Sequence, residues 1–115
     1  MKQSKSMLVL FFTTAMILWM STAYGQDIVI GFSGPLSGPA AEYGQDMLNG
    51  IDMAINEINA AGGITVAGKK YKFRLEKLDD KTDPTAAVNN ARRLRSNGAI
   101  AVFNGVFTTI AAINK

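Results

Sequence analysis

The spacing of apolar residues changes repeatedly along this chain, from runs typical of strands to patterns typical of helices. Residues 27–32 form a short run that is apolar on both faces, and residues 99–103 form a second, fully apolar run; both predict strands. Residues 47–58 carry apolar side chains at three- and four-residue spacing, which predicts an amphipathic helix. Residues 71–78 alternate between apolar and charged side chains, which predicts a half-exposed or edge strand.

Turn and capping residues mark the boundaries of these elements. Residues 62–63 are both glycine and are expected to end the first helix, and residues 64–70 form a small turn or hairpin. Asp83 is a plausible N-cap of a second helix, and Pro84 suits its first helical position. A third helix is expected to open at residues 108–115.

The predicted order of elements is β-α-β-α-β-α. This order predicts an α/β fold with a mainly parallel, Rossmann-like sheet and right-handed crossovers. A unit of three strands and about 90 residues buries little surface and is marginal on its own. We therefore expect the sequence to be the front part of a longer protein.

The N-terminal segment has the layout of a secretory signal peptide. A basic start, an apolar run and small residues before a cleavage point are found, in that order, at Lys2 and Lys5, residues 7–20, and Ala23 and Gly25. The apolar run is shorter than the roughly 20 residues that span a bilayer, which disfavours a membrane anchor. Residues 1–25 are expected to be removed, which leaves residues 26–115 as the mature chain.

The chain contains no cysteine and no histidine. Without cysteine it has no thiolate nucleophile and no lipoprotein attachment point, so we expect a periplasmic product. Without histidine it has neither a Ser-His-Asp triad nor a histidine-based zinc site. Once Lys2 and Lys5 are removed, 10 of the 12 basic residues remain against 9 acidic ones, which gives no electrostatic footprint for nucleic acid.

Two segments lie where α/β proteins hold ligands, beyond the carboxyl ends of strands. Residues 33–44 follow the first strand and residues 104–109 follow the third, and both contain hydroxyl groups and glycines. Helix N-termini at these places favour a carboxylate or another anion. The alternatives are that the first segment only shapes a surface turn, that Tyr43 covers the helix end instead of contacting a ligand, and that Thr108 and Thr109 cap the third helix. The glycine spacing matches no nucleotide-binding loop.

Three acidic residues follow the second strand. Asp79, Asp80 and Asp83 together offer the ligand type that Mg²⁺ and Ca²⁺ prefer, but their spacing does not match an EF-hand loop. We expect Asp79 and Asp80 to form a solvated turn and Asp83 to cap the second helix. No metal or other cofactor is expected.

Two stretches carry a family resemblance. "SGPLSGPAAEYGQDMLNGIDMAINEINAAGGI" resembles the opening of the branched-chain amino-acid binding proteins of ABC importers, which are type I periplasmic binding proteins. "YKFRLEKLDDKTDPTAAVNNARRL" is similar to the second strand, Asp-Asp turn and second helix of that family. The resemblance covers residues 27–110 and depends on several short elements that occur in the family's order.

The resemblance implies two Rossmann-like lobes joined by a hinge, of which this sequence holds part of the first. The ligand, an amino acid or a similar small carboxylate, is held in the cleft and delivered to a membrane permease, with no catalytic step. Tyr43 matches the family's pocket tyrosine, and Thr108 matches the hydroxyl residue that binds the ligand's α-carboxylate. Thr109 is its neighbour and a weaker candidate. Bulky Phe107 departs from the family's more polar pattern.

Two other functions remain open. The same fold also serves as a sensor that reports ligand occupancy to a receptor or regulator. A permease gene beside this one would argue for transport instead. An enzyme needs catalytic residues beyond Lys115 and ranks third.

Overall fold

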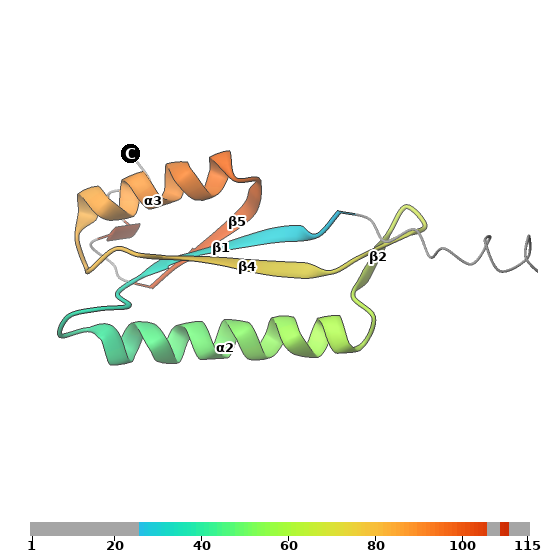
Figure 1. Ribbon diagram of the computed structural model, residues 1–115, viewed down its shortest axis with the longest axis horizontal. Coiled ribbons are helices and arrows are strands. Elements are labelled where there is room, and N and C mark those ends of the chain that lie inside the picture. The colour runs from blue at the N-terminus through green and yellow to red at the C-terminus, as the bar shows by residue number, and fades with distance from the viewer. Residues whose placement is uncertain (1–25, 106–108, 111–115) are drawn as a thin grey trace, which may run out of the picture.

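The computed structural model describes residues 26–105 and 109–110. Its centre is a sheet of three parallel strands in the order β4-β1-β5. The strands are β1 (Ile28–Gly34), β4 (Phe73–Asp79) and β5 (Ala99–Asn104). Helix α2 (Ala41–Ala60) lies on one face of the sheet and helix α3 (Pro84–Ser96) on the other (Figure 1). The predicted α/β fold with a parallel sheet is confirmed.

The central strand β1 is buried on both faces, as its apolar sequence predicts. Ile30 faces α2, and Phe32, two residues further along the same face, is fully buried. On the opposite face, a Cβ atom added to Gly31 would lie 3.0 Å from Cδ1 of Leu94 in α3. This close packing of α3 on β1 buries Leu94 completely.

The hairpin expected after α2 is present as an antiparallel pair, β2 (Ile64–Val66) and β3 (Lys69–Tyr71). The turn out of α2 includes Gly63, which has a φ of 79° and whose added Cβ would lie 2.0 Å from the carbonyl oxygen of Tyr71. The side-chain amide of Asn59 bonds both backbone groups of Phe73, each at 2.8 Å. These contacts tie the end of α2 to the first residue of β4.

The start of α3 is confirmed in detail. The backbone N–H of Ala86 donates a hydrogen bond to Oδ1 of Asp83 at 2.6 Å, and Pro84 is the first helical residue. The start of α2 differs from the expectation. Its N-cap is Ala40, which makes no side-chain capping bond, so the sequence carries no capping signal there.

The segment expected as a loop at residues 33–44 is therefore shorter than predicted. Strand β1 continues to Gly34 and α2 begins at Ala41, which leaves residues 35–40 as the β1–α2 loop. Tyr43 consequently lies in the first turn of α2. Among the described residues, no helix is long and apolar enough to cross a membrane.

Candidate functional site

The carboxyl ends of all three parallel strands meet at one edge of the sheet. Gly34 pairs with Asp79 at the end of β4, and Ser33 pairs with Asn104 at the end of β5. The β1–α2 loop, the turn after β4 and Gly105 after β5 thus lie at this edge. This edge is where open α/β sheets bind ligands, and it contains the described candidate residues.

Tyr43 connects α2 to the segment that follows β5. Its hydroxyl donates a hydrogen bond to the backbone carbonyl of Gly105 at 3.4 Å, while 57% of the residue stays exposed. One turn further along α2, Met47 lies so close that a Cβ on Gly105 would be 2.2 Å from its Sδ. The structure therefore brings the first of the two segments that the sequence singled out into contact with Gly105 of the second, and the exposed phenol of Tyr43 makes this contact.

The two threonines have different outcomes. Thr108 lies outside the described residues, so its proposed contact with a ligand carboxylate remains a prediction. Thr109 is helical and fully buried, and its hydroxyl donates a hydrogen bond of 2.5 Å to Oδ1 of Asn104. This bond holds the end of β5 to the segment that follows it.

Asp79 was expected in a solvated turn, and the sequence did not predict the hydrogen bonds that its carboxylate accepts. Its Oδ1 accepts hydrogen bonds from the backbone N–H groups of Leu36 and Lys81, both at 2.9 Å, and its Oδ2 accepts one from the Ser37 hydroxyl at 2.5 Å. Burial by itself raises the pKa of Asp79, but its three hydrogen bonds and the nearby charge of Lys81 together outweigh this and hold the pKa below its ordinary value of 3.8. Asp79 is therefore ionised at neutral pH.

Asp80 corrects the expectation of a solvated turn, because it is fully buried. Its Oδ2 accepts a hydrogen bond from the Ser33 hydroxyl at 3.1 Å, and its Oδ1 accepts one from the Thr82 N–H at 3.0 Å. Nδ2 of Asn90, from α3, donates to Ser33 Oγ at 3.2 Å and to the Asp79 carbonyl at 3.0 Å. Asp80 and the backbone carbonyl of Asp79 are thus part of a polar network that joins β1, β4 and α3.

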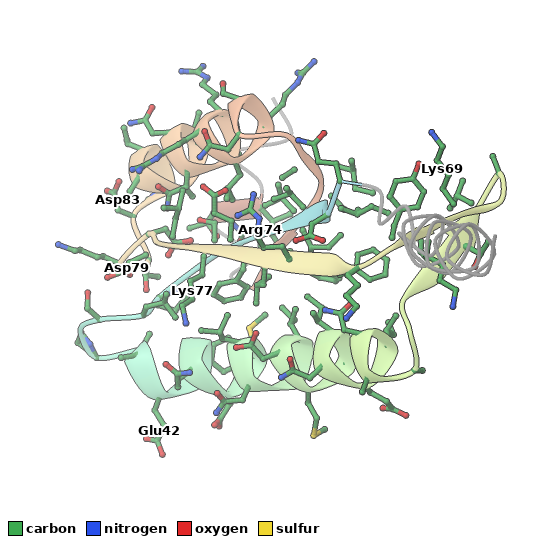
Figure 2. All side chains as sticks on the ribbon, turned by 45° about the vertical axis from the view of Figure 1, so that its right-hand side comes forward. Glu42, Lys69, Arg74, Lys77, Asp79 and Asp83 are labelled. Carbon is green, nitrogen blue, oxygen red and sulfur yellow. The ribbon has the colours of Figure 1, made fainter. Side chains whose placement is uncertain are left out.

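Asp79 and Asp83 lie at the same end of the sheet (Figure 2), but Asp83 is the cap of α3. Within the described ranges, no group of three or more acidic, cysteine or histidine side chains is arranged to hold a metal ion. The signal that was available for the Asp79–Asp80 pair was its position at the carboxyl end of a strand, at the edge where the strand ends meet.

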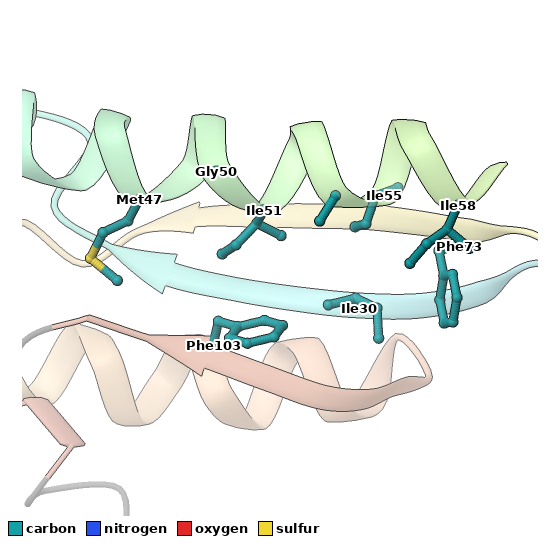
Figure 3. A pocket seen from close by; sticks show the side chains of 9 residues that line it. Ile30, Met47, Gly50, Ile51, Ile55, Ile58, Phe73 and Phe103 are labelled. Carbon is teal, nitrogen blue, oxygen red and sulfur yellow. The ribbon is translucent and has the colours of Figure 1, made fainter. Parts of the chain in front are cut away.

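A separate groove of about 530 Å³ runs between α2 and the sheet (Figure 3). Its lining is Ile30, Met47, Gly50, Ile51, Ala54, Ile55, Ile58, Phe73 and Phe103. The lining side chains carry no charged or hydrogen-bonding group, so the groove offers no side-chain donor to a carboxylate. Its presence leaves Phe103 on β5 51% exposed.

Comparison with known proteins identifies relatives over most of the chain. A family model described as periplasmic binding protein matches residues 27–115. An amino acid binding protein of Pseudomonas aeruginosa is 40% identical over 95 residues, which are 82% of this chain and 24% of that protein. The Leu/Ile/Val-binding protein of Escherichia coli K12 is 35% identical over 82 residues, which are 71% of this chain and 21% of that protein.

Solved structures agree with these relatives. The branched-chain amino acid transporter substrate binding protein of Streptococcus pneumoniae, in complex with isoleucine, is 33% identical with a TM-score of 0.65, over 76% of this chain and 25% of that one. A possible leucine/isoleucine/valine-binding protein of Rhodopirellula baltica is 31% identical with a TM-score of 0.68, over 82% of this chain and 25% of that one. The chain spans a quarter or less of the length of each of these four proteins.

Proposed function

Because this chain belongs to the periplasmic binding protein family, we propose that residues 26–115 form part of the N-terminal ligand-binding lobe of a solute-binding subunit of an ABC importer. The subunit captures a branched-chain amino acid or a similar small carboxylate and delivers it to a membrane permease. The observation that carries this proposal is the meeting of Tyr43 with the segment after β5, at the carboxyl edge of the sheet. The named ligands of the Leu/Ile/Val-binding relatives support the ligand class.

The proposed mechanism is binding without a chemical step. Hydroxyl and N–H donors of the segment after β5 bind the ligand's α-carboxylate, with Thr108 as the main side chain. Tyr43 borders the ligand from α2, where more than half of its surface is exposed. A second lobe closes over the ligand and completes the pocket, and the closed form presents a surface to the permease.

The experiment that tests this proposal is titration calorimetry of the full-length protein with leucine. Wild-type protein is expected to bind, and Thr108→Ala is expected to weaken binding by roughly 1–3 kcal/mol, because the ligand carboxylate loses one hydrogen bond. Thr65→Ala is the matched control, since Thr65 is exposed in β2, which lies at the opposite end of the molecule from the carboxyl ends of the parallel strands (Figure 1). An unchanged affinity in Thr108→Ala removes Thr108 from the site. If leucine, isoleucine and valine all fail to bind, the proposal of a branched-chain amino acid as the ligand is contradicted.

We also propose export to the periplasm through a cleavable signal peptide at residues 1–25. Mass spectrometry of the periplasmic fraction is expected to find a product that begins at Gln26. Replacing the small Ala23 with tyrosine is expected to block cleavage, whereas Ala23→Ser is expected to preserve it. A periplasmic product that still begins at Met1 contradicts cleavage.

A further inference from the structure

A single carboxylate links two segments that are distant in sequence. Asp79 bonds Leu36 and Ser37, more than 40 residues earlier in the chain, and also Lys81 in its own turn. The register of the sheet makes this possible, because Asp79 pairs with Gly34, the last residue of β1. The carboxylate therefore lies where the β1–α2 loop leaves the sheet.

The chemistry of these contacts suits an ionised acceptor. A carboxylate only accepts hydrogen bonds, and all three partners of Asp79 are donors. Hydrogen bonds to a charged acceptor are roughly twice as strong as those between neutral groups. Lys81 and Thr82 hold φ angles of 52° and 62°, which are unfavourable for residues with a side chain, so the turn needs such contacts to persist.

The β1–α2 loop in turn determines where α2 begins. Pro35 is fully buried, and its carbonyl oxygen lies against Gly44, where an added Cβ would be only 1.8 Å away. Tyr43 precedes Gly44 in the same helical turn and reaches Gly105 after β5. A displacement at Leu36 therefore reaches Tyr43 through a short, closely packed segment.

We propose that Asp79 is a positioning residue: its carboxylate fixes the β1–α2 loop and thereby sets Tyr43 in place at the ligand-binding edge before the ligand arrives. This role depends on the proposed function for its effect on affinity. Asp79 does not contact the ligand itself. It acts through Leu36 and Ser37, so its loss affects binding more than a substitution that costs similar stability elsewhere.

Three variants of the full-length protein test this role. Asp79→Ala removes the acceptor, and Asp79→Asn keeps one oxygen that can still accept from the Leu36 and Lys81 N–H groups. Asp83→Ala is the matched control, because Asp83 also accepts a bond from a backbone N–H but caps α3. The readouts are hydrogen exchange of the Leu36 amide without ligand, leucine affinity by calorimetry, and Tm.

Asp79→Ala is expected to speed exchange of the Leu36 amide about tenfold or more and to raise the Kd for leucine about tenfold. Asp79→Asn is expected to keep most of the wild-type protection of the Leu36 amide and most of the wild-type affinity for leucine. Asp83→Ala is expected to lower Tm while leaving Leu36 exchange and the Kd unchanged.

The proposal is overturned if Asp79→Ala leaves Leu36 exchange unchanged, or if Asp83→Ala raises the Kd as much as Asp79→Ala does. If the wild-type protein binds no leucine, the proposed function fails for that ligand. The Leu36 exchange rates then decide by themselves whether Asp79 holds the loop.

Discussion

Replacing Gly44 with alanine is expected to destabilise the protein by roughly 3 kcal/mol, at the upper end of the usual range for overpacking. Gly44 is buried in the first turn of α2, and an added Cβ would lie 1.8 Å from the carbonyl oxygen of Pro35 and 2.7 Å from its carbon. Both atoms belong to the backbone, so no side chain can rotate away. Either the β1–α2 loop or the first turn of α2 must move, and either movement is expected to displace Tyr43, which lies in that first turn.

Equilibrium unfolding in denaturant measures this effect, and the same helix provides the control. Gly50 lies exposed in the interior of α2, and an added Cβ there meets no atom within 4 Å. Gly50→Ala is therefore expected to stabilise the protein by up to about 1 kcal/mol, because alanine favours helix more than glycine does. The two substitutions should have opposite signs. Stabilisation by Gly44→Ala would show that the approach of α2 to Pro35 is not close.

The order of the strands and helices from β1 to β5 could be predicted because its signals are local, whereas most of the third helix expected at residues 108–115 lies outside the described residues. Each strand and helix carries its own apolar spacing, which can be read from that segment alone, without knowledge of its tertiary contacts. The start of α3 was predicted to the residue because Asp83 and Pro84 each have a specific chemical role at a helix start. The hairpin was predicted because glycine permits the backbone angles that its turns require.

The start of α2 could not be predicted in the same way. Ala40 occupies the N-cap without a capping side chain, and a glycine- and proline-containing loop precedes it. The helix begins there because its first turn packs against Pro35, with Gly44 as the point of closest approach. That constraint is a contact between backbone segments, which leaves no periodic pattern in the sequence.

The candidate site was only partly predictable, for a related reason. The rule that ligands bind at the carboxyl ends of strands selected two segments, and the structure brings Tyr43 of the first into contact with Gly105 of the second. The hydrogen bonds of Asp79 and Asp80 with residues of β1 and the loop after it depend on the register between β1 and β4, which the sequence does not specify. Two adjacent aspartates at the end of a strand are typical of a solvated turn, so the burial of Asp80 could be recognised only from the structure.

That burial predicts the second large effect. Asp80→Ala is expected to lower the free energy of unfolding by about 3 kcal/mol, because the buried Ser33 hydroxyl and the Thr82 N–H each lose their hydrogen-bond acceptor. Asp46→Ala is the control, since Asp46 lies exposed on α2 and such surface changes usually stay within about 0.5 kcal/mol. Denaturant unfolding of both variants provides the comparison.

A double-mutant cycle separates the Ser33–Asp80 contact from the general effect of removing a buried polar side chain. With Ser33 already replaced by alanine, no hydroxyl remains to be left without its acceptor, so Asp80→Ala should destabilise the protein less than it does in the wild type. Asn90, which donates to Ser33, loses a partner in Ser33→Ala but keeps the Asp79 carbonyl. Additive effects of the two substitutions would mean that Asp80 and Ser33 do not interact.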